Sequence, residues 1–324
     1  MREERINIFM QSRAFSAACF AFALAMTVIT WNKGGETAAA GDGILPMEGF
    51  RAFLQGTAGT VLNFILFVLT TVIMITVNRR FSYLGSLTTL DAALFSIFQG
   101  AVPALAMPWS DGSLVALITW LCTGSLFHIY DKRQATPQIF LIFAALSAMS
   151  MFQSAFVFLL PLFFIGIIQM RIAGLKGILA MIFGIATPYW IALGMGIVSP
   201  ESLHFPEMVS VFELESIPFH LYFGFGVAAL GVIAVTANTL TLIKYRLQLR
   251  VYNGFTLFTI LFCIIMLVAD SGNALAYLPL LNIVVGTQTA HWFVAKNYKR
   301  KYIALTFIIL LACSAFGLYT FYLK

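Results

Sequence analysis

Few side chains in this sequence could do chemistry, and the first of them is Asp42. It stands in a polar segment between two long apolar runs, just ahead of a stretch with helical periodicity. In that stretch Glu48 and Arg51 share one face, which is the pattern of a helix lying in a membrane interface. Asp42 would then serve as a general base or metal ligand toward a lipid-linked substrate, with Glu48 and Arg51 as candidate binding residues. The alternative is that Asp42 forms a turn and that Glu48 and Arg51 only face water.

A second group of polar residues falls within one apolar run late in the sequence. Read as a helix, this run places Asn282 and Thr289 on one face and Gln288 and His291 on another. Polar groups in hydrocarbon need partners, so these faces either hydrogen-bond to other helices or line a path for a substrate. Asn282, Gln288 and His291 are therefore candidate substrate-binding residues.

The remaining polar residues inside apolar runs have simpler interpretations. Asp91 follows Thr88 at the spacing of a capping box, which predicts that it closes the start of a helix near the membrane surface. The single amides Asn63, Gln99 and Asn238 are typical of residues that hydrogen-bond one membrane helix to another.

The elements that must position these residues are predicted to be membrane-spanning helices. A helix rising about 1.5 Å per residue needs about 20 apolar residues to cross about 30 Å of hydrocarbon. The candidate ranges, of which the third, fifth and sixth are short, are Ala14–Trp31, Thr57–Asn78, Asp91–Met107, Ser113–Tyr130, Pro137–Gln153, Ala155–Met170, Gly177–Ser199, Pro218–Ile243, Gly254–Asp270, Asn273–Phe293 and Tyr302–Phe321. The predicted fold is an all-α transmembrane bundle of about 11 spans.

Composition supports the same class. The chain is 60% hydrophobic and 10% charged, with a mean hydropathy of +0.92. Such a chain has too few polar groups to cover the surface of a soluble protein of this size. No polar linker divides the apolar runs, so residues 1–324 are predicted to form a single integral membrane domain.

The distribution of Lys and Arg predicts the orientation. If the N-terminus is cytoplasmic, 16 of the 19 basic residues fall in cytoplasmic segments and 3 fall outside. Short cytoplasmic loops carry such an excess, so we expect a multi-pass protein of a bacterial inner (cytoplasmic) membrane with its C-terminus in the periplasm. The formal net charge of +6 is then a signature of topology and does not indicate a nucleic-acid partner.

No motif in the sequence indicates a cofactor or a metal. All 4 cysteines fall inside predicted spans without C-x-x-C spacing, and the common nucleotide-binding, metalloprotease and hydrolase motifs are absent. We therefore predict no cofactor and no metal. The expected partners are membrane lipids, together with either a lipid-linked substrate or other membrane proteins of the cell envelope.

Several short motifs carry a resemblance over most of the chain. They are Asn78-Arg79-Arg80-Phe81, Ser86-Leu87-Thr88, Leu160-Pro161-Leu162, Gly184-Ile185-Ala186-Thr187-Pro188-Tyr189 and Leu278-Pro279-Leu280. Together they resemble a family of uncharacterised bacterial multi-spanning membrane proteins. The resemblance implies the same multi-pass topology, and it supplies no activity.

A more distant likeness concerns the segment around Asp42. Asp42-Gly43 with Met47–Phe50 and Leu54–Gly56 is similar in arrangement to the first outer loop of GT-C-type membrane glycosyltransferases, which use polyprenyl-phosphate sugars. The likeness implies that Asp42 is the catalytic base and that Arg51 contacts a lipid phosphate, although the usual paired acidic residues are missing. Three functions stay open: a component of a cell-envelope process, a lipid-linked glycan enzyme, and a small-solute transporter.

Overall fold

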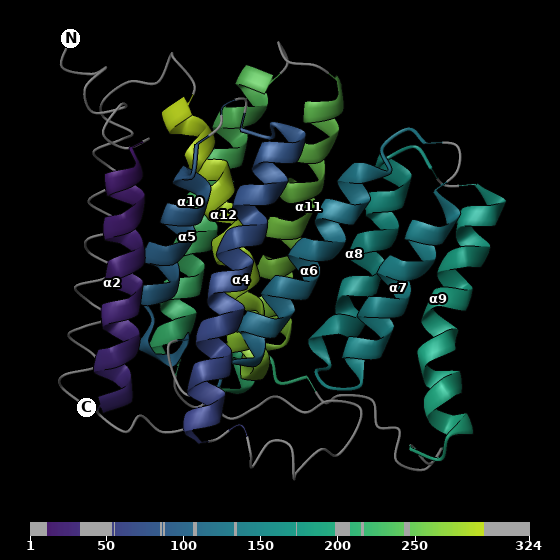
Figure 1. Ribbon diagram of the computed structural model, residues 1–324, viewed down its shortest axis with the longest axis horizontal. Coiled ribbons are helices and arrows are strands. Elements are labelled where there is room, and N and C mark those ends of the chain that lie inside the picture. Colours follow the sequence, from purple (N-terminus) through teal and green to yellow (C-terminus); the bar gives the residue numbers. More distant parts are fainter. Residues whose placement is uncertain are drawn as a thin grey trace.

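The computed structural model describes residues 12–32, 54, 56–84, 86, 88–105, 109–132, 135–172, 174–197, 208–214, 217–242 and 247–294. Over these residues the fold is all-helical, as predicted, and the long helices run side by side (Figure 1). The α-helices are α2 (Arg13–Asn32), α4 (Thr57–Phe81), α5 (Leu90–Gly100), α6 (Asp111–His128), α7 (Thr136–Ser150), α8 (Ala155–Gln169), α9 (Leu175–Gly194), α10 (Phe219–Leu242), α11 (Leu247–Ala269) and α12 (Ala274–Val294).

These helices overlap the first ten predicted ranges, and the last predicted range, Tyr302–Phe321, lies outside the described residues. Of the described helices, α2, α4, α9, α10 and α11 are long and apolar enough to cross a membrane. Two shorter helices, α7 and α8, are also apolar. The chain therefore has the helices of a membrane protein, while the total of about 11 spans and the orientation stay predictions.

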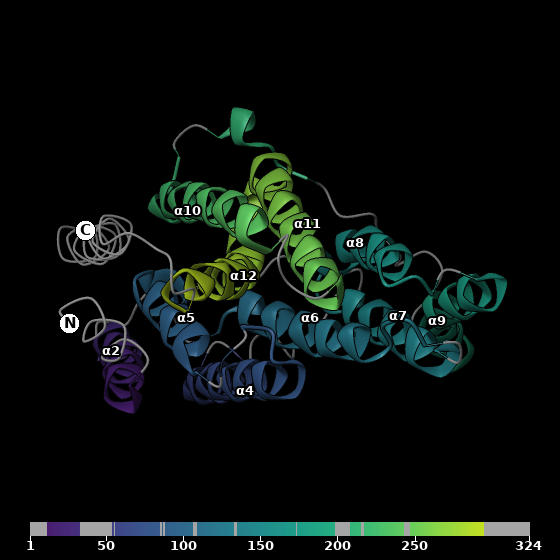
Figure 2. The same ribbon diagram turned by 90° about the horizontal axis from the view of Figure 1, so that it is seen from above.

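The outward faces of the bundle are apolar. Helix α4 exposes Val61, Ile65, Leu69 and Val72, which recur every three or four residues and so form one stripe. At the edge of the bundle α9 packs chiefly on α7, and its Trp190 side chain is 80% exposed (Figure 2). Large apolar faces of this kind are disfavoured in water and suit contact with lipid chains.

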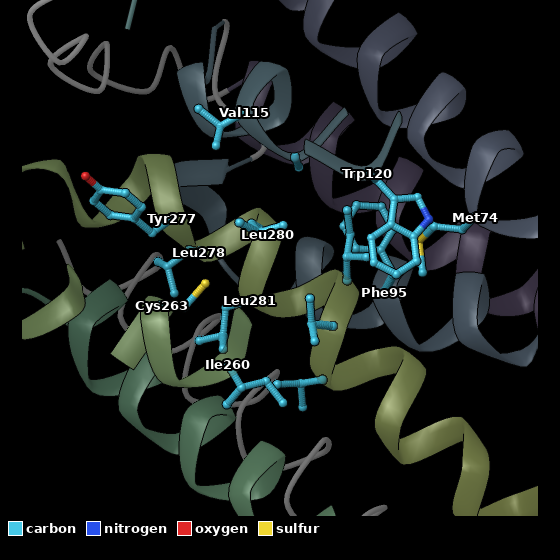
Figure 3. Close-up of a cluster of buried hydrophobic side chains, with 14 of the residues drawn as sticks. Met74, Phe95, Val115, Trp120, Ile260, Cys263, Tyr277, Leu278, Leu280 and Leu281 are labelled. Carbon is cyan, nitrogen blue, oxygen red and sulfur yellow. The ribbon is translucent and has the colours of Figure 1, made fainter. Parts of the chain in front are cut away.

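Helix α12 forms the centre of the bundle. It contacts α5, α6, α10 and α11, and Figure 2 shows it enclosed among them. Its apolar residues point to every side, as expected of a helix that is buried all round. In Figure 3, Leu278, Leu280 and Leu281 of α12 pack near Ile260 and Cys263 of α11.

Helix α5 is much shorter than the range Asp91–Met107 predicted for it. It ends at Gly100 and is followed by a single 3₁₀ turn, Pro103–Leu105. Pro103 explains the end, because the residue before a proline is disfavoured in helical conformation and proline cannot donate to the preceding turn. The 11 residues of α5 rise only about 16 Å, roughly half of a bilayer's hydrocarbon. The chain therefore leaves the α-helical conformation within the bundle, and the 3₁₀ turn lies beside α2 and α12.

The fifth and sixth predicted ranges form two short helices with a tight connection between them. Helix α7 ends at Ser150, α8 begins at Ala155, and each helix has 15 residues. Gln153 and Ser154 in the connection are both buried. The two helices form a short hairpin whose connection is tucked into the protein.

Candidate functional site

The two polar faces predicted for α12 contact different neighbours. Asn282 donates from Nδ2 to Gln99 Oε1 of α5 at 3.4 Å. Gln288 instead faces α10 and α11, where it hydrogen-bonds to Asn238 and Asn253. Each face thus belongs to a separate interface between helices.

Gln288 is held by a buried network of protein groups. Its Nε2 lies 2.6 Å from both Asn253 Oδ1 and Thr256 Oγ1 and 3.1 Å from Tyr83 Oη. Its Oε1 accepts a hydrogen bond from Asn238 Nδ2 at 2.8 Å. Three acceptors therefore share the two hydrogens of the amide, which leaves the Gln288 side chain well satisfied by protein. For Gln288, hydrogen bonding between helices is the interpretation that the geometry favours.

His291 extends this face by about one turn. Its ring packs at an angle of 64° against Tyr83, with the ring centroids 5.0 Å apart. The Nε2 atom is buried, and it has no hydrogen-bond partner among the described residues. Tyr83 contacts both Gln288 and His291, so the α4–α5 connection covers this face of α12.

The second face of α12 runs antiparallel to α5 in a definite register. Asn282 pairs with Gln99, and a side chain on Gly286 would come within 3.2 Å of Phe95 N and 3.4 Å of Asp91 O. The absence of a side chain at Gly286 lets the two backbones approach closely. Continuing this register by one turn places Asp91 beside the part of α12 that follows Gly286.

Asp91 is a carboxylate within this interface, and it does not complete the predicted capping box. Thr89 is the N-cap of α5 and makes no side-chain cap hydrogen bond, whereas Thr88 Oγ1 accepts from Leu90 N at 3.2 Å. The Asp91 side chain is 1% exposed. Backbone N–H groups of Asp91 and Ala92 interact with the carboxylate, but its Oδ1 has no partner in the described part of the chain. The backbone at the start of α5 thus satisfies only part of the hydrogen-bonding capacity of the buried Asp91 carboxylate.

A small polar cavity lies at the other end of α5, where the helix stops. Its volume is about 20 Å³, which is enough for one water molecule. Amide and hydroxyl groups from Thr27, Asn63, Gln99 and Ser113 line it, and the apolar and backbone lining comes from Ala23, Phe64, Phe67, Gly100 and Leu105. Asn63 Nδ2 donates to Leu105 O at 3.3 Å, so one amide already hydrogen-bonds to the end of the 3₁₀ turn.

The interrupted helix α5 and its surroundings form the candidate site. One end of α5 carries the buried Asp91 carboxylate, and the other end opens on the polar cavity. The C-terminal end of a helix carries partial negative charge, so both ends of this site favour a cation or a hydrogen-bond donor.

A third polar cluster holds Asp270 at the opposite end of the bundle from the α4–α5 connection. Asn273 Nδ2 donates to Asp270 Oδ1 at 3.0 Å, and Tyr277 Oη donates to Oδ2 at 2.8 Å. Burial raises the pKa of Asp270, while the hydrogen bonds from Tyr277 and Asn273 act in the opposite direction. Asn273 N also donates to Asp270 O at 3.1 Å, so Asp270 and Asn273 form a local turn to which Tyr277 is bonded.

The three candidate residues in and after the segment of Asp42 are not tested by the structure. Asp42, Glu48 and Arg51 lie outside the described residues, so their roles stay predictions. Among the residues that the structure does describe, no group of three His, Cys, Asp or Glu side chains could hold a metal ion.

Some members of these clusters can be recognised in the sequence and others cannot. Gln99 and Asn238 are predicted to make contacts between helices, and both do so. Tyr83 follows a basic pair and has the position of a loop residue, and Asn253 stands just before a predicted span, so neither is predicted to join a cluster. Their partners depend on which helices are neighbours, and a hydropathy pattern carries no such information.

Comparisons of this chain with protein-family models, with curated proteins and with solved structures find no match.

Proposed function

We propose that this protein is a small-solute transporter of a bacterial inner membrane that binds a small cation, including a proton, at the interrupted helix α5. In this proposal the chain has about 11 spans, with the N-terminus in the cytoplasm and the C-terminus in the periplasm.

The observation that carries the proposal is the end of α5 inside the bundle, at a polar cavity. Non-helical backbone at membrane depth is costly in contact with lipid, and it is found where it is enclosed by protein or lines a cavity. Discontinuous helices of this kind form the substrate and ion sites of many transporters. Here the cavity is bordered by Gln99 and Asn63, and the turn after α5 packs against α2 and α12.

Asp91 supports a cation as the ligand. A carboxylate inside a membrane domain is expensive, so its presence there favours a role in binding or moving ions. The Asn282–Gln99 hydrogen bond lies on the same α5–α12 interface, two to three turns from Asp91 along α5. The interface therefore offers oxygen ligands at both ends, which suits a small cation or a proton.

Contacts among the described basic residues support the proposed orientation. Arg80 at the end of α4 lies 3.2 Å from His128 at the end of α6, and Lys132 lies 3.0 Å from the same ring. Asp131 N donates to Met170 O at 3.2 Å, which brings the α6–α7 and α8–α9 connections together. Basic residues from three connections thus gather at one end of the bundle, as the positive-inside rule expects of a cytoplasmic face.

The test is electrical. The full-length protein is reconstituted into proteoliposomes on a solid-supported membrane and exposed to steps of Na⁺, K⁺, NH₄⁺ or pH. Binding of a cation at a buried site moves charge into the membrane domain and gives a transient current. We expect a transient for at least one of these ions, and its loss in Asp91→Asn.

A matched control is Asp131→Asn, which removes a carboxylate from an exposed turn. It should keep the transient, and both variants should keep the thermal unfolding midpoint of the parent within a few degrees. Transients absent for all four ions, or present at full size in Asp91→Asn, would show that α5 is not a cation site.

A further inference from the structure

A second, larger hollow opens between α2, α4 and α5, on the basic side of the bundle. It measures about 300 Å³, and its lining residues are Arg13, Ser16, Ala17, Phe20, Thr71, Ile75, Thr89, Ala92, Ala93 and Ser96. Small residues of α5 form the floor, while α2 and α4 supply the two walls. We call this hollow the α2/α4 groove.

The α2/α4 groove is closed at depth by aromatic rings. Phe20 of α2 stacks on Phe67 of α4 with centroids 5.3 Å apart, and Phe67 stacks on Phe95 of α5 at 5.7 Å. Arg13 lies seven residues before Phe20, so the groove extends about 10 Å along α2 from the arginine to the stack. The stack separates this groove from the small cavity at the end of α5, which Phe67 also lines.

Two guanidinium groups stand at the mouth of the α2/α4 groove. Arg13 lines it directly and is exposed. Arg79 is exposed on α4, four residues after the lining residue Ile75, and so lies on the same helical face. Its neighbour Arg80 is directed toward His128 instead. No carboxylate of the described residues pairs with Arg13 or Arg79, and among these residues the two guanidinium groups supply positive charge above a largely apolar interior.

We propose that the α2/α4 groove binds one anionic phospholipid, with its phosphate between Arg13 and Arg79 and the upper part of one acyl chain along Ala17, Phe20 and Ile75. Arginine recognises phosphate through paired hydrogen bonds, and the Ser16 and Thr89 hydroxyls, which lie 2.7 Å apart, supply further polar groups near the mouth. Basic pockets between membrane helices on the cytoplasmic side bind anionic headgroups in this way. In the proposed orientation this is the cytoplasmic leaflet, but the site itself does not depend on the transporter proposal.

The interior of the groove selects a lipid over a free anion. Ala17, Phe20, Ile75, Ala92 and Ala93 offer apolar surface that an inorganic phosphate or a glycerol phosphate would leave uncovered. An acyl chain would fill that space and remove the apolar surface from contact with headgroups and water.

The experiment measures lipid binding to the purified full-length protein. Native mass spectrometry and thermal unfolding are followed while phosphatidylglycerol or phosphatidylcholine of the same acyl chains is added. We expect one retained phosphatidylglycerol per chain and a higher unfolding midpoint, with little effect of phosphatidylcholine. Arg13→Gln and Arg79→Gln should each weaken the phosphatidylglycerol effect about fivefold, whereas Lys132→Gln, which removes the same charge at the α6–α7 turn, should not.

A second pair of variants tests the groove without changing charge. Ala17→Phe fills the groove from the exposed side of α2 and should abolish the preference, while Ala18→Phe, exposed but not part of the lining, should keep it. The proposal is overturned if Ala17→Phe leaves the preference intact, because binding would then be attraction to surface charge alone. It is equally overturned if glycerol phosphate raises the midpoint as much as phosphatidylglycerol, since the site would then bind free phosphate.

Discussion

Replacement of Gln288 by methionine tests the buried network around α12. Methionine keeps the length and volume of the side chain, so the change removes hydrogen bonds without leaving a large cavity. The Gln288 amide makes two donated bonds and one accepted bond at a time, to partners that include Asn253, Thr256 and Asn238. Hydrogen bonds within membrane proteins average about 0.6 kcal/mol, so Gln288→Met should lower the free energy of unfolding by about 2 kcal/mol.

The assay is reversible unfolding in mixed micelles with increasing dodecyl sulfate, followed by circular dichroism. The control is Gln138→Met on α7, because Gln138 Oε1 is buried without a partner among the described residues. This variant should be as stable as the parent or more so, since it removes an unsatisfied acceptor. A cycle with Asn238→Leu should show coupling with Gln288→Met of at least about 0.5 kcal/mol. Equal stability of Gln288→Met and the parent, or strict additivity in the cycle, would refute the network.

Three further predictions concern packing, pH and access. Gly286→Leu should lower the free energy of unfolding by about 1–3 kcal/mol, because the new side chain would meet the backbone of α5. Gly226→Leu on α10, where the new side chain would face open space, should leave the free energy of unfolding unchanged. Unfolding by dodecyl sulfate measures both variants. Burial raises the pKa of Asp270 in the folded protein above its value of about 3.9 in the unfolded chain. Asp270 therefore favours the folded state most at a pH below the unfolded pKa, and this stabilisation is lost as the pH rises through the folded pKa. Unfolding midpoints from pH 4 upward should therefore fall less steeply in Asp270→Asn than in the parent, and parallel curves would contradict this. Cys263 is fully buried, so in a chain whose other cysteines are serine it should react with a polar maleimide only after unfolding, as judged by mass spectrometry.

The helical class and most helix positions could be predicted from the sequence because hydropathy directly reports which segments avoid water. Helix bounds were less predictable. Helix α11 begins at Leu247, seven residues before the predicted Gly254, because a helix can continue through polar residues such as Arg250 beyond the apolar stretch. Helix α5 stops at Gly100 although apolar residues continue, because hydropathy does not distinguish a buried helix from buried irregular backbone.

The candidate site was predictable only one helix at a time. The periodicity of α12 correctly separated Asn282 from Gln288, since positions on a helix follow from its geometry. The position of Asp91 against α12 was not predictable. It depends on the close approach that Gly286 allows and on the register of α5 and α12, two helices that lie far apart in the sequence.

The shortness of the α7–α8 hairpin has a consequence for the bilayer itself. Fifteen residues rise about 22 Å, against about 30 Å for typical hydrocarbon, and tilting would only shorten the span further. Where these two helices cross a bilayer, the neighbouring lipids would have to compress to match them, and we expect the membrane beside this hairpin to be locally thin. Bilayer thickness would then act as a mechanical load on one side of the protein, and reconstitution in shorter-chain lipids should relieve it.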